Sequence, residues 1–294
     1  MELRQLKYFV RAAELMNFTQ AASELHITQS TLSQQIKTLE DTLSAPLFDR
    51  VGKRVRLTEA GRLFLNHARK TIQQAEEGRQ ILLDLVDGKT GTLTIGATYG
   101  LTALLVRSIA AFSKKYPGIR INIVFGSTGD LLHQLESGNI DAMLSFLPPA
   151  SFPAVESKPL FIAHLSLVVH KSHPRSGQKK ITLRQLANLP LALPAKSYSI
   201  RNYLDEILAQ SDIHLDSRLE VNDINMLLQL ADTGEWCTVL MNTSLFNFPS
   251  LKAIPIEGPD MRRQATISFA AGAYKKRSLT EFHKLLIAGT AICQ

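Results

Sequence analysis

Six polar side chains close together in the sequence have the chemistry needed to contact nucleic acid. They are Gln29, Ser30, Thr31, Ser33, Gln34 and Lys37. A glutamine amide can form two hydrogen bonds with adenine in the major groove, and a serine hydroxyl can bond to several base edges. A lysine can neutralise a backbone phosphate. Each residue alone could be an ordinary solvated side chain, so the prediction rests on the set.

A second group is basic. It consists of Arg50, Lys53, Arg54 and Arg56, and Asp49 is the only acid beside it. Such residues can neutralise phosphates and so add affinity without reading sequence. Arg54 or Arg56 could also enter a minor groove. The alternative is a solvated turn with no ligand.

A third group lies at four junctions where a predicted strand meets a predicted helix. The candidates there are Thr98, Tyr99, Ser127, Thr128, Lys196, Ser197, Ser199 and Asn222, with Phe146 at the end of another strand. Hydroxyls and free N–H groups at helix starts suit a carboxylate or another small anion, and Lys196 or Arg201 would add charge. Tyr99, Phe146 and Tyr198 could form an apolar wall. Serine and threonine are also ordinary N-caps, and aromatic residues are more often core.

The elements that position the first two groups are short helices and strands. Apolar residues fall on one face of a helix near residues 3–13, and Thr19 is expected to cap a second helix that runs to about Leu25. Thr28 is expected to cap a third, whose stripe is Leu32, Ile36, Leu39 and Leu43. Two helices joined by a tight turn, followed by two strands over 47–57 with a basic tip, predict a winged helix-turn-helix.

Thr58-Glu59 is expected to cap a long helix that runs to about Asp87. Its seam repeats at steps of four and three residues: Phe64, Ala68, Ile72, Ala75, Arg79, Leu82 and Val86. A near-heptad seam favours pairing with a second copy. Packing against the protein's own globular part is the alternative.

The remainder alternates strands and helices, which predicts α/β layers with largely parallel sheets. The expected strands span 92–97, 120–125, 142–146, 165–170, 191–193, 217–221, 237–241 and 266–271. The expected helices span 101–115, 129–137, 199–210, 223–233 and 278–292. Across 294 residues the net charge is +7, and the two cysteines, Cys237 and Cys293, favour a reducing compartment without a disulfide framework. No apolar run is long enough for a membrane span, and no catalytic constellation or metal cluster stands out.

The first sixty residues resemble the LysR-type transcriptional regulators. The resemblance rests on Leu6-Lys-Tyr-Phe9, Phe18-Thr-Gln-Ala-Ala22, the segment from Leu25 to Ile36, Leu47-Phe-Asp-Arg50 and Leu57-Thr-Glu-Ala-Gly61. The remainder is similar to that family's effector domain, as in Gly91-Thr-Leu-Thr-Ile-Gly96. One departure is Ser44, which stands where the family usually has glycine, so the helix is either strained there by about 1 kcal/mol or ends differently.

The resemblance implies an α/β fold class with a helix-rich N-terminal part. It implies a winged helix-turn-helix over 1–58, a linker and dimerisation helix over 59–88, and a two-lobed effector domain of the periplasmic-binding-protein type II fold over 89–294. The first lobe is expected over 89–162 and 266–294 and the second over 163–265. The chain should cross between lobes near 161–163 and return near 264–266.

By the same resemblance, Gln29, Ser30 and Ser33 would contact bases, with Thr31, Gln34 and Lys37 nearer the phosphates. The expected partners are a roughly palindromic DNA duplex, a small effector that is expected to be anionic, further copies of the chain in a dimer and a tetramer, and RNA polymerase. No cofactor, no metal and no membrane is expected, and the expected compartment is the cytoplasm. Two rivals remain open: a solute-binding module and an enzyme on the same two-lobed fold.

Overall fold

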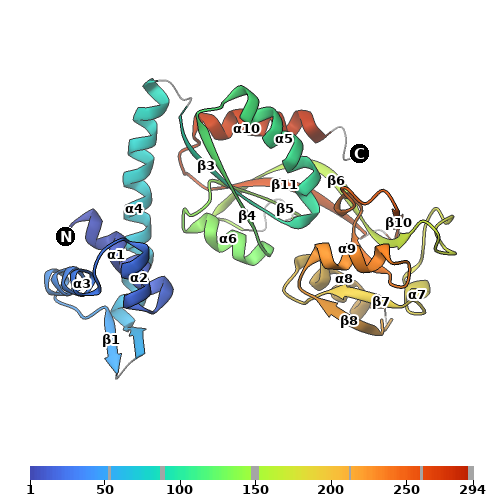
Figure 1. The fold of residues 1–294 in the computed structure, drawn as a ribbon, viewed down its shortest axis with the longest axis horizontal. Helices are drawn as coiled ribbons and strands as arrows, with labels where there is room; N and C mark the ends of the chain where they lie inside the picture. Colours follow the sequence, from blue (N-terminus) through green and yellow to red (C-terminus); the bar gives the residue numbers. More distant parts are fainter. Residues whose placement is uncertain (52–53, 87–89, 147–151, 212, 259–260, 291–294) are drawn as a thin grey trace. The chain divides into compact units, whose positions relative to one another are not determined.

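The computed structural model describes the chain except for residues 52–53, 87–89, 147–151, 212, 259–260 and 291–294. It divides into two compact units, residues 1–86 and 87–294 (Figure 1).

The first unit is a helix-turn-helix with a two-stranded wing and a long helix. Its elements are α1 (Leu3–Leu15), α2 (Phe18–Glu24), α3 (Gln29–Leu43), β1 (Phe48–Val51), β2 (Arg54–Leu57) and α4 (Glu59–Val86). The wing strands pair antiparallel, with Phe48 opposite Leu57. Phe9 lies at the centre of the core, edge-on to Phe48 with ring centroids 5.5 Å apart, and Phe18 meets Phe48 in the same way at 5.1 Å. One apolar core therefore holds α1, α2 and the wing together.

The structure shows that one of the N-caps predicted for α2 and α3 is wrong and confirms the other. The cap of α2 is Asn17, whose side chain accepts hydrogen bonds from the N–H groups of Thr19 and Gln20, so the prediction that Thr19 caps this helix is wrong. Asparagine is at least as good an N-cap as threonine, and Phe18 is buried at the first helical position. Thr28 caps α3 as predicted, because its hydroxyl accepts from the N–H of Thr31 at 3.1 Å.

Ser44 ends α3 in the left-handed conformation, with a φ of 53°. The N–H of Ser44 donates to the carbonyl of Asp41, and the N–H of Ala45 donates to the carbonyl of Glu40 at 3.1 Å. This is the Schellman arrangement that usually has glycine at the left-handed position. Of the two outcomes expected for Ser44, the structure shows the strained one.

The second unit contains a large mixed sheet and a small parallel one. Its strands are β3 (Gly91–Ala97), β4 (Ile119–Phe125), β5 (Ala142–Ser145), β6 (Val155–His170), β7 (Leu191–Pro194), β8 (Ser217–Val221), β9 (Thr238–Met241), β10 (Leu251–Pro255) and β11 (Arg262–Ala270). Its helices are α5 (Thr102–Lys115), α6 (Thr128–Glu136), α7 (Leu183–Leu186), α8 (Ser199–Ser211), α9 (Ile224–Asp232) and α10 (Arg277–Gly289), with short 3₁₀ turns η1 (Tyr99–Leu101) and η2 (Asn242–Ser244).

The long strand β6 joins the two lobes. The seven-stranded sheet has the order β10-β6-β11-β5-β3-β4, and β9 also pairs with β6. The first half of β6 pairs with β11, whereas its second half pairs with β9 and β10. The β6–β11 register shifts between Ala265 and Thr266, which lies in the segment where the sequence predicts the chain to return between lobes.

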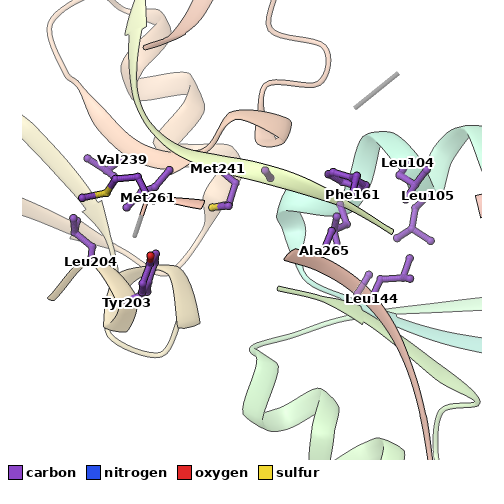
Figure 2. Packing of buried hydrophobic residues seen from close by; sticks show 14 of the residues in the cluster. Leu104, Leu105, Leu144, Phe161, Tyr203, Leu204, Val239, Met241, Met261 and Ala265 are labelled. Atoms are coloured by element: carbon purple, nitrogen blue, oxygen red, sulfur yellow. The ribbon is translucent and has the colours of Figure 1, made fainter. Parts of the chain in front are cut away.

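The core follows the same strands. Figure 2 shows two groups of buried side chains along β6 and its neighbours, one around Leu105, Leu144 and Phe161, the other around Val239 and Met241. Both groups belong to one hydrophobic cluster, so the apolar core continues from one lobe into the other. Among the described residues, no helix is both long enough and apolar enough to cross a membrane.

Candidate nucleic-acid interface and effector cleft

Five of the six predicted DNA-reading residues lie together on one face of α3, whereas Thr31 lies off that face. Leu32, Ile36 and Leu39 are fully buried on the opposite face, which fixes the rotation of the helix about its axis. Five of the six candidates are exposed, and Ser33 is half-buried. A shallow hollow runs along this face and ends at the turn before the wing, and it is lined by Gln29, Ser30, Ser33, Gln34, Lys37, Glu40, Asp41, Ser44, Ala45 and Pro46. The sequence thus predicted the polar part of the surface but not the turn at its far end.

Glu40 attaches the end of this helix to the wing. Its Oε1 accepts hydrogen bonds from the N–H of Leu47 at 2.7 Å and of Phe48 at 3.0 Å. A carboxylate that accepts two N–H bonds makes strong, directional contacts. Glu40 therefore adds a polar attachment between α3 and β1 to the apolar packing described above.

Thr58 and Gly61 attach the start of α4 to the same segment. The Thr58 hydroxyl donates to the carbonyl of Pro46 at 2.7 Å and accepts from the N–H of Gly61 at 2.9 Å, so Thr58 caps α4 as predicted. A Cβ on Gly61 would lie 2.1 Å from the carbonyl oxygen of Leu47, a distance that real Cβ atoms do not reach. Only glycine allows this approach of helix to wing.

The basic wing residues are described only in part. Arg50 lies in β1 and Arg54 in β2, but their side chains fall outside the described set, as does Lys53 altogether. Arg56 is exposed on β2, opposite Asp49. The basic tip remains a prediction.

The predicted seam of α4 divides into two parts. Phe64, Ala68 and Ile72 pack into the core of the first unit, with Ala68 almost fully buried. Ala75 and Arg79 are exposed, and Leu82 is 64% exposed, whereas the side chain of Val86 lies outside the described set. The first half of the seam therefore has its partner within the unit, and the second half presents an apolar side chain to solvent.

A small cavity between the two lobes collects many of the predicted effector residues. It is lined by Thr98, Tyr99, Gly100, Gly126, Ser127, Thr128, Phe146, Tyr198, Ser199, Ile200, Ile224, Leu240, Met241 and Ser244. Lys196, Ser197 and Asn222 are not among the lining residues. The sequence gives no signal that Leu240, Met241 and Ser244 line a binding site. Residues in and beside a buried strand are expected to be ordinary core.

The cavity is closed by direct contacts across it. The Thr128 hydroxyl, at the first position of α6, donates to the Ser199 hydroxyl, at the first position of α8, over 3.0 Å. The rings of Tyr99 and Tyr198 lie 6.2 Å apart, and Tyr99 stacks on Phe125 at 4.8 Å. The enclosed volume is about 30 Å³, whereas a drug-sized ligand needs roughly 300 Å³ or more. In this conformation the cavity is too small for such a ligand, so binding requires the lobes or the lining side chains to move.

The polar groups of the cavity include helix starts from both lobes. The Thr98 hydroxyl is buried without a hydrogen-bond partner among the described residues. Ser127 caps α6, since its hydroxyl accepts from the N–H of Asp130 at 3.2 Å, and it donates to the Asp130 carboxylate at 2.6 Å. That carboxylate partly offsets the positive end of the α6 dipole.

Of the two cations expected to supply charge, Lys196 does not line the cavity and Arg201 is paired elsewhere. Arg201 is 7% exposed; its guanidinium binds Asp205 at 2.9 Å and Glu220 at 2.8 Å and donates to the carbonyl of Pro194. Among the described lining residues none carries a charge. The expectation that Arg201 adds charge to the ligand site is therefore wrong, because two carboxylates already neutralise it.

Cys237 is buried in the second lobe. Burial raises the pKa of its thiol to about 11, and its Sγ lies 3.8 Å from Nε2 of His173. A thiol with so high a pKa is protonated at neutral pH and a poor nucleophile. Cys293 lies outside the described residues, and the described part of the chain has no cluster of three metal-binding side chains.

Comparison with known proteins covers almost the whole chain. The family model described as "Bacterial regulatory helix-turn-helix protein, lysR family" matches residues 3–62, and the model described as "LysR substrate binding domain" matches residues 87–291. The HTH-type transcriptional regulator AlsR of Bacillus subtilis is 32% identical over 84% of this chain and 83% of its own length. A protein of Phaeodactylum tricornutum named "Probable RuBisCO transcriptional regulator" is 29% identical over 95% of this chain and 94% of its own length.

Two solved structures share the fold. A full-length OxyR variant of Pseudomonas aeruginosa has a TM-score of 0.75 at 24% identity, covering 97% of this chain and 94% of its own. The regulatory domain of CcmR of Synechocystis PCC6803, solved in complex with 2-PG, has a TM-score of 0.61 at 19% identity, covering 68% of this chain and 98% of its own. These two structures show the fold. The two family models and the likeness to AlsR show that the chain belongs to the LysR family of DNA-binding transcriptional regulators and not to a family of enzymes.

Proposed function

We propose that α3 enters the major groove and reads bases through Gln29, Ser30 and Ser33, while Thr31, Gln34, Lys37 and the wing cations meet phosphates. The observation that carries this proposal is the fixed rotation of α3, whose fully buried stripe turns the polar face outward. Hydroxyl and amide groups there match base edges.

The exposed second half of α4 supports a dimer formed through that helix. A dimer with two-fold symmetry places two reading helices in successive major grooves, so the target is a roughly palindromic site. We also propose that dimers assemble into a tetramer, that the protein contacts RNA polymerase and that it works in the cytoplasm. The proposed boundaries between domains and lobes follow residues 58, 88, 162 and 265.

The second unit is proposed to hold a small effector in the cavity between its lobes. Hydroxyls of Thr98, Thr128 and Ser199 converge there, and α6 and α8 both begin at its wall. Aromatic rings of Tyr99, Phe146 and Tyr198 supply an apolar side. This combination supports a small anion with an apolar body, bound by hydroxyls and helix dipoles without a side-chain cation. The regulatory domain of CcmR in complex with 2-PG is a case of a small ligand on the same fold.

The DNA proposal is tested by gel shift of the full chain on DNA from upstream of its own gene, with excess competitor. A competitor-resistant shift is expected, and Gln29→Ala should weaken it by roughly tenfold, about one good base contact. Glu136→Ala, on α6 in the other unit, is the matched control and should bind like the parent. Equal binding by all three proteins would contradict the assignment of α3.

The effector proposal is tested by calorimetry with pairs of a small carboxylate and its neutral amide. The carboxylate should bind more tightly, and Thr98→Val should weaken it without changing the gel shift in the absence of ligand. A consistent preference for the amide, or for an amine, would overturn the anionic assignment while leaving the DNA proposal intact.

A further inference from the structure

The positive charge of this chain is not where a DNA-binding protein would be expected to keep it. The helix-turn-helix and wing, residues 1–58, contain eight Lys and Arg against six Asp and Glu. Residues 157–204 contain eight Lys and Arg and no acid at all. Because the whole chain has a net charge of +7, the residues outside 157–204 carry a net charge of −1. The excess of positive charge therefore lies entirely within residues 157–204 of the second unit.

Five of these cations lie on one surface segment. Lys171, Arg175, Lys179, Lys180 and Arg184 span the loop after β6 and the start of α7. Successive turns compact this loop, with the N–H of Ser176 donating to the carbonyl of His173 and the N–H of Gln178 to that of Arg175. The loop lies against β10, where Lys252 adds a sixth cation whose Nζ donates to the carbonyl of Ser176. We call these six residues the basic edge; Figure 1 shows α7 and β10 at the margin of the second lobe.

The basic edge is not neutralised by the protein. Four of its loop cations and Lys252 are exposed, and Arg175 is half-buried. Within the described part of the chain no salt bridge reaches any of the six. The acids near the loop are Asp232, which accepts from the Ser250 hydroxyl, and Glu235 and Glu257 on adjoining segments. Six cations against three acids leave a local positive field.

The chemistry of the surface distinguishes between two kinds of partner. A protein interface needs an apolar or aromatic centre and is poor in lysine. Among the described residues between 163 and 273, which include β10, Met226 on α9 is the one large apolar side chain that is substantially exposed. A lysine-rich surface without apolar anchors suits a phosphate backbone, which is bound by charge and without sequence preference.

We infer that the basic edge of the second lobe is a second DNA-contacting surface, which binds backbone phosphates independently of the helix-turn-helix. It adds affinity and salt dependence but no base recognition. The inference goes beyond the reading role of α3 and does not require that role, because it concerns binding to any duplex.

The test is a salt series of fluorescence-anisotropy titrations of the full chain on a random-sequence duplex. The variant K179E/K180E/R184E should bind more weakly, and its slope of log affinity against log salt should be smaller by about 2.7, or about 0.9 for each lost phosphate contact. The control K158E/R218E/R262E reverses three exposed cations of the same unit outside the basic edge. It makes the same change in net charge and should retain most of the parent's slope.

A second measurement does not depend on charge-reversal variants folding well. Gly177 lies within the loop, and a Cβ there meets nothing within 4 Å, so a photo-crosslinking benzoylphenylalanine can replace it. Irradiation with the duplex should give a DNA adduct that the same replacement of Arg218 does not give. Equal slopes for the two triple variants, or adducts to protein alone, would overturn the inference. Neither outcome would affect the separate test of α3, in which Gln29→Ala is expected to weaken sequence-specific binding in the gel shift.

Discussion

Gly61 shows how one missing side chain sets the position of the wing. Gly61→Ala places a methyl group against the carbonyl of Leu47, so α4 and the wing must separate. Overpacking of this kind costs about 1–3 kcal/mol, and we expect a lower midpoint of urea unfolding. Gly78→Ala is the control in the same helix, since a Cβ there meets nothing, and it should stabilise by about 1 kcal/mol. Stabilisation of Gly61→Ala to the same extent as Gly78→Ala would contradict the prediction, because it would show helix propensity acting without a cost for the close approach to Leu47.

The buried thiol of Cys237 gives a pH dependence with a definite sign. Its folded pKa is raised from 9.0 to about 11, so between these values the unfolded chain has lost a proton that the folded chain keeps. The stabilisation is complete below about pH 9 and is lost as the pH rises towards 11. The free energy of unfolding should therefore fall more steeply over this range in the parent than in Cys237→Ala.

The same burial predicts chemical inertness. With Cys293 replaced by serine, the native protein should react with a thiol reagent only after denaturation. Hydrogen peroxide should leave DNA binding unchanged. Rapid labelling of the folded protein would contradict the buried, protonated thiol.

At the residue scale, most helix N-caps could be predicted from the sequence, but the groups that would contact a ligand were harder to predict. Thr28 and Thr58 cap helices as predicted, because each hydroxyl directly precedes its helix and accepts from an N–H of the first turn. The cap of α2 is Asn17, a stronger acceptor two residues before the expected Thr19. Arg201 could not be placed from sequence, since its partner Glu220 is distant along the chain and its neutralisation depends on packing.

At the scale of elements, the end of α3 offers a stabilising change. Ser44 holds a φ of 53° that glycine adopts without penalty. Ser44→Gly should raise the free energy of unfolding by about 1 kcal/mol, measured by urea titration. Lys37→Gly, inside the same helix, should lower it by roughly the same amount. If both changes destabilise, the left-handed cap is not strained.

Element types could be predicted from periodicity, but element lengths could not. Strand β6 runs for 16 residues where six were expected, because its first half, around Pro159 and Leu160, lacks a regular alternation. Strand β10 was missed altogether: Leu251–Pro255 is short and ends in proline. Its pairing with β6 depends on distant contacts that propensity does not encode.

At the scale of the whole molecule, self-association should depend on the second half of α4. Leu82→Lys replaces an apolar side chain that is 64% exposed, and it should shift the protein towards monomer in sedimentation experiments. Gln74→Lys, an exposed polar position on the same helix, is the control and should not. An unchanged assembly in Leu82→Lys would place the interface elsewhere.

The path of β6 and β11 has a consequence for synthesis on the ribosome. The first lobe's sheet contains β3, β4 and β5, but β11 pairs with β5 and with the first half of β6. That sheet cannot be completed until residue 270 has emerged, although its first strand begins at residue 91. The partners of the second half of β6 end at Pro255, so they are available earlier. The lobe that begins first in the chain is therefore the one whose folding finishes last, and it must wait as an exposed sheet edge, a state prone to aggregation, while the other lobe is translated.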